Sequence, residues 1–361
     1  MIMIRQHVHV RQLNSGRVKA FIGSLFSLAL LLSGCGPMDG GMEIQPSHTV
    51  HPTTADTTLP VETLTPISTQ TMIPPTPTLG VGSTLISDRD GILLLYVPAG
   101  EFLMGSNDKP LTDDQSPSYY DHSPQHSVTL DAFWIDQTEV TNKQYSLCVL
   151  DNACILPLDL KSPMRSSYYG DPQFENYPVV NVEWAMAKTY CEWAGRRLLT
   201  EAEWEKAARG VEGLIYPWGN DTPNENLLNY NSAVRDTTEV GSYPEGKSLY
   251  GVLDMAGNVW EWVYDAYDEA YYQKSPSSNP LGPDVDESAA DYPRVLRGGS
   301  WYFKEGSGRS IFRFGVLPAE DLVRADIRSW SGLTYADTSL TGRTAHGLGT
   351  VGFRCALSAI P

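Results

Sequence analysis

The clearest hydrophobic pattern in the chain is a helical one near its middle. Trp184, Ala187, Cys191 and Ala194 recur at intervals of three and four residues, which places them on one face of an α-helix. A glycine follows Ala194, at the position where helices commonly stop. The pattern predicts an amphipathic helix over this stretch.

A second helix is predicted directly after the first. Thr200 and Glu203 have the spacing of a capping box, in which each side chain bonds the backbone N–H of the other residue. Trp204, Ala207 and Ala208 then supply a buried face. The glutamates of this helix are expected to form a solvated first turn, favoured by the helix dipole. These glutamates are Glu201, Glu203 and Glu205.

Upstream, the apolar positions predict short strands and one more helix. Residues 91–106 fit two strands around a Pro-Ala-Gly turn, and residues 126–135 begin with alternating apolar positions before a buried run. Thr141 or Asn142 is expected to cap a helix that carries Tyr145. The last roughly 150 residues show only turns and short strands. Two main helices followed by a loop-rich β region predict the α+β class.

The first 34 residues have the pattern of a bacterial export signal. Four basic residues precede an apolar run, Ala20–Leu32, which is too short to span a bilayer comfortably. The run ends in Leu-Ser-Gly-Cys, which resembles a lipobox with cleavage before Cys35 and a diacylglycerol on its sulfur. The alternative is an ordinary signal peptide or membrane anchor with an incidental cysteine. We expect residues 1–34 to be a lipoprotein signal peptide and the mature chain to be lipid-anchored in the bacterial cell envelope.

Residues 35–86 differ in composition from the rest of the chain. Between residues 36 and 86 there are 12 Thr and 8 Pro, with few charges or aromatic residues. Such a segment cannot bury enough apolar surface to offset the entropy of ordering it. It is predicted to be a disordered tether with a mean span of about 40 Å. The globular domain is then expected over residues 87–361.

The charge balance limits the class of partner. The 361 residues carry a formal net charge of −17. Nucleic acid is excluded as an expected partner, because phosphate binding needs a positive face. An acidic surface suits divalent cations and basic ligands, although it also serves solubility alone.

Six motifs follow one another along the rest of the chain. They are "FWIDQTEVTNKQY", "NVEWAMAKTYCEWAGRRLLTEAEWEKAARG", "YPWGN", "YGVLDMAGNVWEW", "RVLRGGSW" and "VGFRCA". Together they resemble the formylglycine-generating-enzyme, or sulfatase-modifying-factor, domain family over about residues 94–356. The resemblance implies a loop-rich variant of the C-type-lectin-like fold with bound calcium.

The resemblance also marks where copper chemistry would take place. The best-known members of the family oxidise a sulfatase cysteine to formylglycine with copper held by two thiolates, just after a Gly-Gly-Ser-aromatic turn. That turn is retained as Gly298, Gly299, Ser300 and Trp301. The two thiolate positions fall at Phe303 and Gly308, and no cysteine lies between Cys191 and Cys355. Copper(I) needs soft thiolate ligands, so copper is not expected here.

Four cysteines remain if Cys35 is lipidated, and three pairings of them are open. An exported chain is expected to keep them oxidised. The short spacing favours a loop bridge between Cys148 and Cys154, and the family resemblance pairs Cys191 with Cys355. Free buried thiols are the alternative.

One segment has the composition of a calcium loop. Calcium prefers six to eight hard oxygens, often carboxylates mixed with backbone carbonyls. Asp254 and Glu261 supply carboxylates, and Gly257 and Val259 supply carbonyls. The resemblance implies a family calcium site at these positions, with Asp254 in place of an amide-type ligand. The alternative is a strand whose tryptophans face the core and whose Glu261 faces solvent.

The family's other calcium site matches less well. It begins with an asparagine and the next carbonyl, here Asn229 and Tyr230, and a further carbonyl would come from Val234. The expected aspartate falls at Ser232, so Asp236 is the candidate substitute.

Other chemistry has little support in the sequence. A nucleophilic Ser300 would need a base within hydrogen-bond reach. The histidines of the domain are His122, His126 and His346, and the first two are expected at ordinary surface positions. Their spacing fits no common metal-ligand pattern.

A binding role is therefore the favoured hypothesis. Tyr-rich segments at residues 166–170 and 265–272 offer flat, amphipathic contact surfaces. We expect a surface lipoprotein whose domain binds an unidentified extracellular or periplasmic ligand or protein, or serves as an envelope scaffold. The alternative is an enzyme of the sulfatase-modifying family. The substrate, the type of envelope and the oligomeric state are not readable from the sequence.

Overall fold

The computed structural model describes residues 79–108, 121–286, 292–302, 308–316 and 348–359. All of them belong to the unit formed by residues 73–361. The expected signal peptide, Cys35 and most of the expected tether lie outside the described residues, as do Phe303 and His346. No helix in the described part of the chain is both long and apolar enough to cross a membrane.

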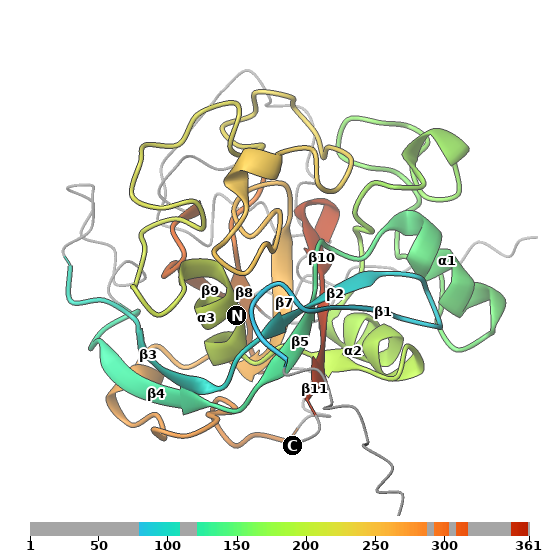
Figure 1. Ribbon diagram of the computed structural model, residues 1–361. Helices are drawn as coiled ribbons and strands as arrows, with labels where there is room; N and C mark the ends of the chain where they lie inside the picture. Colours follow the sequence, from blue (N-terminus) through green and yellow to red (C-terminus); the bar gives the residue numbers. More distant parts are fainter. Residues whose placement is uncertain (1–78, 109–120, 287–291, 303–307, 317–347, 360–361) are drawn as a thin grey trace, which may run out of the picture. The chain divides into compact units, whose positions relative to one another are not determined.

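The larger of the two main sheets is antiparallel throughout and is ordered β1-β2-β5-β11-β6 (Figure 1). Its strands are β1 (Thr84–Ile86), β2 (Leu93–Val97), β5 (Phe133–Asp136), β6 (Arg197–Leu198) and β11 (Cys355–Ser358). Every residue of β5 is buried, as the run of apolar residues predicts. The last strand of the chain, β11, lies inside this sheet, between β5 and β6.

The second main sheet is ordered β10-β7-β8-β9. Its strands are β7 (Trp260–Ala266), β8 (Arg294–Arg297), β9 (Arg313–Val316) and β10 (Val351–Phe353). β10 runs parallel to β7, and the other pairs are antiparallel. A separate hairpin pairs β3 (Gly100–Met104) with β4 (His126–Leu130). β2 and β3 flank the predicted Pro-Ala-Gly turn, which confirms that prediction.

The described chain contains three α-helices of similar length. They are α1 (Asn142–Leu150), α2 (Trp184–Trp193) and α3 (Glu201–Arg209). Thr141, not Asn142, caps α1 and forms a capping box with Gln144. The predicted Thr200–Glu203 capping box of α3 is also present. Short 3₁₀ turns occur at Pro172–Phe174, Pro244–Gly246, Tyr271–Gln273 and Leu348–Thr350.

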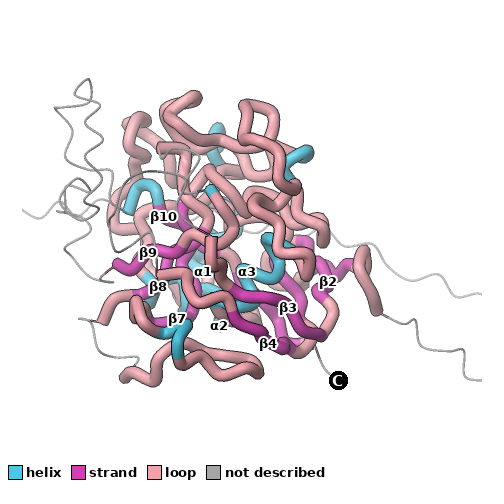
Figure 2. The backbone as a smooth tube through the Cα atoms, turned by 90° about the vertical axis from the view of Figure 1, so that its left-hand side faces the viewer, coloured by secondary structure: helices cyan, strands magenta, loops and turns pink. Residues whose placement is uncertain are grey.

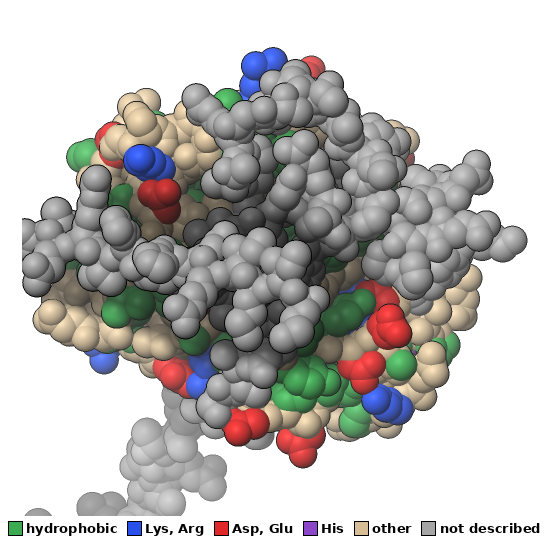
Figure 3. All heavy atoms as spheres, turned by 180° about the vertical axis from the view of Figure 1, so that it is seen from behind, with side chains coloured by type: hydrophobic (Ala, Val, Ile, Leu, Met, Phe, Trp, Pro, Cys, Tyr) green, Lys and Arg blue, Asp and Glu red, His purple; other side chains and the backbone are tan. Residues whose placement is uncertain are grey.

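Loops connect these elements and make up most of the described backbone (Figure 2). They hold their shape because aromatic and aliphatic side chains pack beneath them. One hydrophobic cluster gathers around α2 and includes Trp184, Trp260 and Trp262. A second gathers around α3 and includes Trp204 and Met255. On the face shown in Figure 3, acidic side chains lie along the lower edge, interleaved with single basic ones.

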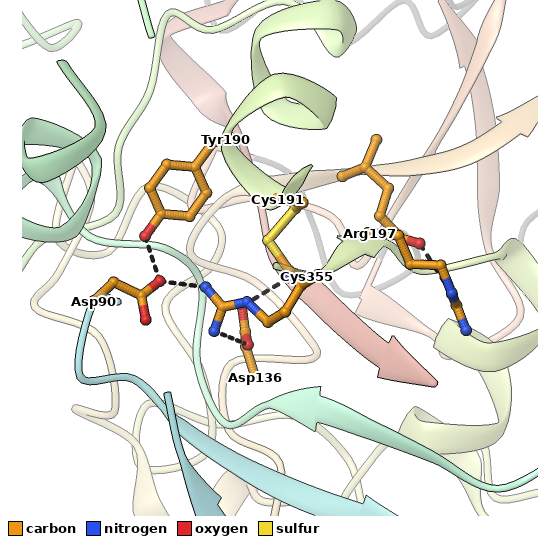
Figure 4. Close-up of a disulfide and its surroundings, with 8 residues drawn as sticks. Asp90, Asp136, Tyr190, Cys191, Arg197 and Cys355 are labelled. Atoms are coloured by element: carbon orange, nitrogen blue, oxygen red, sulfur yellow. Dashed lines mark hydrogen bonds and ion pairs between the residues drawn. A yellow bond between two sulfur atoms is a disulfide. The ribbon is translucent and has the colours of Figure 1, made fainter. Parts of the chain in front are cut away.

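Both predicted disulfides are formed. Cys148 and Cys154 bridge the end of α1 to the following loop, and Cys191 on α2 is joined to Cys355 on β11. Figure 4 shows the polar cluster beside the second bridge. The Asp136 carboxylate accepts hydrogen bonds from the Cys355 N–H (2.8 Å) and from Arg196 (2.9 Å). Arg196 also pairs with Asp90, so a buried ion network surrounds this disulfide.

Part of the Tyr-rich segments is unavailable as a contact surface. Tyr168, Tyr271 and Tyr272 are all buried. Their rings pack inward because their neighbours supply partners: the Tyr168 hydroxyl donates to the Pro178 carbonyl oxygen at 2.7 Å, and Arg313 lies over the Tyr272 ring at 4.5 Å. The expectation of exposed tyrosine loops is therefore wrong for these three residues.

Candidate functional site

The retained turn rests on α3 and on the loop before β7. Gly298 and Gly299 both have positive φ values (90° and 75°), a backbone region that favours glycine. A Cβ on Gly298 would lie 3.2 Å from the Trp204 ring. The Gly257 N–H donates to the Gly298 carbonyl oxygen at 2.9 Å. Ser300 and Trp301, which complete the turn, are both buried.

The chain returns to the same place at Gly308. A Cβ on Gly308 would lie 3.5 Å from Leu228 and 3.8 Å from Ala256, so the position is lined by aliphatic groups. Met255, the neighbour of Ala256, contacts the Gly298 position through its carbonyl oxygen at 3.6 Å. Both arms of the loop thus pack against one short stretch. At Gly308 this chain has no side-chain donor where a thiolate would bind copper.

Two buried arginines fasten the base of this loop to α3. Arg297, the last residue of β8, donates to Glu205 at 2.8 Å and to Glu201 at 3.1 Å. Arg313, its partner in the β8–β9 register, forms a two-bonded pair with Glu201 at 2.7 and 2.8 Å. Arg297 also donates to the Ser310 carbonyl oxygen at 2.7 Å. All four charged side chains are at most 1% exposed.

The glutamates of α3 are therefore buried ligands of arginine rather than a solvated turn. Glu201, Glu203 and Glu205 are all buried, which contradicts the expectation from the helix dipole. Burial alone would raise the pKa of Glu205, but Arg297 and Arg209 hold it below its usual value. The expectation failed because these arginine partners, apart from Arg209, lie far along the chain or on other elements.

Next to this network lie Asp121 and His122, both buried. The Tyr267 hydroxyl donates to Asp121 Oδ2 at 2.7 Å, and Arg313 donates to the Asp121 carbonyl oxygen at 3.2 Å. Burial raises the pKa of the Asp121 carboxyl to about 7 and lowers the pKa of His122 to about 4. The expectation that His122 lies at an ordinary surface position is wrong. His126 lies at the start of β4 and is half-buried, with its ring against Tyr272.

The first expected calcium loop places Asp254 beside a carboxylate that the sequence did not single out. Asp254 has a positive φ of 56°, and its Oδ2 accepts the Gly241 N–H at 2.6 Å. Glu139 lies next to it, fully buried, with Oε2 unpartnered among the described residues. Burial, and then the charge of Asp254, raises the pKa of Glu139 well above its usual value. An oxygen-rich, electron-rich position of this kind fits a hard cation.

Glu261 does not face solvent. Arg354 binds it with two hydrogen bonds of 2.7 Å, and Trp204 Nε1 donates to it at 2.9 Å. Arg354 also acts on Glu139 and Asp254 through its charge, without an ion pair to either. Trp260 and Trp262 on the same strand are buried, as expected for a strand anchored by tryptophan.

The second expected calcium loop has a different arrangement. Asn229 is buried, and its Oδ1 has no partner in the described part of the chain. The Asp236 carboxylate, however, is fully used: it accepts from Ser162 at 2.6 Å and pairs with Arg165 at 3.2 Å. Tyr230 accepts the Ala233 N–H through its carbonyl oxygen. Val234 is exposed. The Asp236 carboxylate is thus engaged by other groups, and the second calcium site stays a prediction.

The two expected calcium loops touch each other. The Asn258 N–H donates to the Asn229 carbonyl oxygen at 2.9 Å, and a Cβ on Gly257 would lie 2.3 Å from the same oxygen. Gly257 is therefore required by a close backbone approach. Val259 is fully buried directly before β7.

A polar groove of about 410 Å³ lies elsewhere, among β2, β5 and the start of α1. Amide and hydroxyl side chains line it, including Gln137, Thr138 and Gln144. None of its lining residues belongs to the turn or to the calcium loops, so the groove is separate from the candidate site.

The turn, the helices that carry it and the order of the motifs define one class of protein. The chain belongs to the sulfatase-modifying factor enzyme 1-like domain family, whose sequence model matches residues 89–328. The formylglycine-generating enzyme of Streptomyces coelicolor is 32% identical over 257 residues, which cover 57% of this chain and 77% of that enzyme. In structure, the chain is similar to PvdO from Pseudomonas aeruginosa, with a TM-score of 0.57 and 25% identity over 78% of this chain and 100% of the other.

Another relative is a larger protein that matches this chain over only part of its own length. The serine/threonine-protein kinase Pkn1 of Chlamydia trachomatis is 38% identical over 221 residues, which are 58% of this chain and 33% of the kinase. This chain therefore spans about a third of that relative. These likenesses confirm the family and its mixed α and β fold.

Proposed function

We propose that this chain is an exported bacterial lipoprotein whose domain binds a ligand and does not form formylglycine. In this proposal residues 1–34 direct export and Cys35 carries the lipid. The segment between Cys35 and β1, whose residues 84–86 already pair in the sheet, tethers the domain to the membrane. The observation that carries the non-catalytic part is the state of the thiols. All four cysteines of residues 87–361 are used in disulfides.

Copper(I) at a two-coordinate site needs thiolate ligands, because this soft ion prefers soft sulfur donors. Gly308 supplies no ligand atom, and the surrounding Leu228 and Ala256 side chains supply none either. The domain retains the buried turn and the arginine–glutamate network beneath it. A buried, ion-paired turn without the reactive thiols suits ligand binding rather than oxidation of a substrate.

Structural calcium is part of the proposal. Asp254 and the carbonyls of Gly257 and Val259 would hold the ion, and the unpartnered Oε2 of Glu139 fits as a further oxygen. Glu261 would act on it only through charge, since Arg354 and Trp204 already occupy both carboxylate oxygens. Calcium bound there would fix the loop that supports Gly298.

A peptide-oxidation assay tests the function. The purified domain is loaded with copper and incubated with a Cys-x-Pro-x-Arg peptide, and the peptide mass is followed. We expect no conversion. A mass change to formylglycine would overturn the proposal and support the alternative, an enzyme of this family. That alternative is favoured by the 77% coverage of the Streptomyces coelicolor enzyme.

A further inference from the structure

The returning arm of the loop carries an arginine in an unusual position. Arg309 directly follows Gly308, and the next residue, Ser310, is fastened on both sides. The Ser310 N–H donates to the Ile215 carbonyl oxygen at 2.9 Å, and its own carbonyl oxygen accepts from Arg297. Arg309 is therefore held by a backbone that the ion network keeps in place.

Arg309 has no acidic partner among the described residues. Its side chain is enclosed, with the residue only 8% exposed, yet it forms no ion pair there and its Nε makes no hydrogen bond. Asp108 and Tyr216 act on it only through longer-range electrostatics. A guanidinium taken out of water without a carboxylate is costly, because its lost hydration is not replaced.

Five other buried arginines of the described residues are paired with carboxylates. Arg196, Arg209, Arg297, Arg313 and Arg354 each bind a carboxylate at 3.1 Å or less or in direct contact. Arg309 differs from these five arginines because it pairs with no carboxylate in the described part of the chain and its buried Nε makes no hydrogen bond there. Arginine donors of this kind bind carboxylate, phosphate and sulfate groups through paired hydrogen bonds.

Two hydroxyl groups near it are also available. Ser310 Oγ and Ser300 Oγ are buried and have no hydrogen-bond partner in the described part of the chain. Ser300 lies on the outgoing arm, two residues after Gly298, and Ser310 lies on the returning arm, two residues after Gly308. The Gly298 and Gly308 positions contact the neighbouring residues Met255 and Ala256, so the two backbone segments that carry these hydroxyls approach the same stretch of chain.

Several arginines surround this position. Arg297, Arg309 and Arg313 all act electrostatically on His122, and Arg209 acts on Arg309. Glu201 and Glu205 are paired with the other three arginines, and not with Arg309. Burial also lowers the pKa of Arg309, which is the direction expected for an unpaired cation. A fixed, unpaired guanidinium attracts anions.

We propose that Arg309, with the hydroxyls of Ser300 and Ser310, forms a subsite for an oxyanion group, a carboxylate, phosphate or sulfate, on the ligand bound at this turn. This inference rests on the proposed ligand-binding role, which the peptide-oxidation assay tests separately. It gives the ligand a chemical class that the acidic net charge of the chain does not suggest. The site lies where the family places copper, and it replaces thiolate chemistry with anion recognition.

The test uses inorganic phosphate, sulfate and acetate as probes on the purified mature chain. We expect at least one of them to raise the melting temperature saturably, while sodium chloride at the same ionic strength does not. Arg309→Gln weakens that binding about tenfold or more, as expected for loss of a charged hydrogen-bond donor. Arg309→Lys retains part of it, and Ser310→Ala weakens it several-fold.

The matched control is Arg235→Gln, which removes the same charge from an exposed position. It leaves binding unchanged. The three probes also separate the sources: a response to phosphate and sulfate alone indicates a tetrahedral oxyanion, and a response to acetate indicates a carboxylate. The inference is overturned if the wild-type chain responds to none of the probes, or if Arg309→Gln and Ser310→Ala bind as well as the wild type.

Discussion

Arg354 and Glu261 form a two-bonded ion pair that is closed to solvent at both ends. Their atoms meet at 2.7 Å twice, and both side chains are 0% exposed. Arg354 lies between β10 and β11, and Glu261 lies on β7, so the pair joins the two main sheets. The pair also neutralises one of the two carboxylates that act on Glu139.

Removal of Arg354 is expected to be strongly destabilising. Arg354→Met leaves Glu261 buried without a counter-charge, which costs about 3–5 kcal/mol of unfolding free energy. Urea denaturation measures the loss. The control is Lys143→Met, which breaks the exposed pair with Glu175 and costs less than about 1 kcal/mol. Equal losses in the two variants would contradict the proposed role of burial.

The two disulfides are expected to differ in their contribution. Cys191 and Cys355 are 164 residues apart, whereas Cys148 and Cys154 are 6 apart. In the chain-entropy model the long bridge contributes about 5 kcal/mol and the short one about 2 kcal/mol. Chemical denaturation of the Cys191→Ala/Cys355→Ala and Cys148→Ala/Cys154→Ala variants compares them. A larger loss for the short bridge would be evidence against this ranking.

Substitution by alanine should lower the stability of the domain strongly at one glycine and change it little at another. Gly105 has φ +78°, and a Cβ there would lie 2.4 Å from the His122 carbonyl oxygen. Gly105→Ala is therefore expected to cost about 2–4 kcal/mol. At Gly308 a Cβ meets only ordinary contacts of 3.5 Å and longer, so Gly308→Ala changes stability by less than about 1 kcal/mol. Thermal unfolding of both variants decides the matter.

Asp121 should make the domain less stable as pH rises toward neutrality. Its folded pKa of about 7 lies above the unfolded value of 3.8, so the folded state binds more protons between these limits. Stability then falls as pH rises from about 4 to 7 and is constant with respect to this group above that range. Tyr267, Arg313, Glu201 and Arg297 are the charged or polar groups that face it.

The Asp121→Asn variant has an amide at this position, which does not bind or release a proton in this pH range. Relative to wild type, it is expected to gain up to about 4 kcal/mol of unfolding free energy between pH 4 and pH 7. Denaturation curves of both proteins across this range give the difference. A difference that stays flat with pH would show that folding does not raise the pKa of Asp121.

Calcium is expected to stabilise the domain through Asp254. Chelation with EGTA should lower the melting temperature, and added calcium should restore it, because an ion that binds only the folded state stabilises it. Asp254→Ala and Glu139→Gln should lose most of this response. Asp284→Asn, at an exposed position, should keep it. A wild-type melting temperature unaffected by EGTA and calcium would remove the metal from this loop.

The sequence predicts the features that depend on residues close together in the chain. Thr200 and Glu203 are three residues apart, so their capping box is readable without the fold. The buried faces of α2 and α3 follow from periodicity for the same reason. The order of the six motifs added what local patterns do not carry, namely the family and the pairing of Cys191 with Cys355.

The predictions that failed concern side chains whose partners are remote in sequence. Glu201 is bound by Arg297 and Arg313, 96 and 112 residues further along the chain. Glu139 and Asp254 meet only after β5 and the loop before β7 are in place. No periodicity marks such meetings, so a buried charge is indistinguishable from a solvated one until the sheets assemble. Arg309 was missed because the lack of a partner is visible only in three dimensions.

The position of β11 has a consequence for how the molecule is made. The last strand of the chain completes the middle of the five-stranded sheet, between β5 and β6. Until residues 355–358 have left the ribosome or the export channel, β6 has no neighbour in that sheet and Cys191 has no partner. The five-stranded sheet therefore closes only after residues 355–358 have been made, and a chain truncated before residue 355 should lack both β11 and the bridge to Cys191.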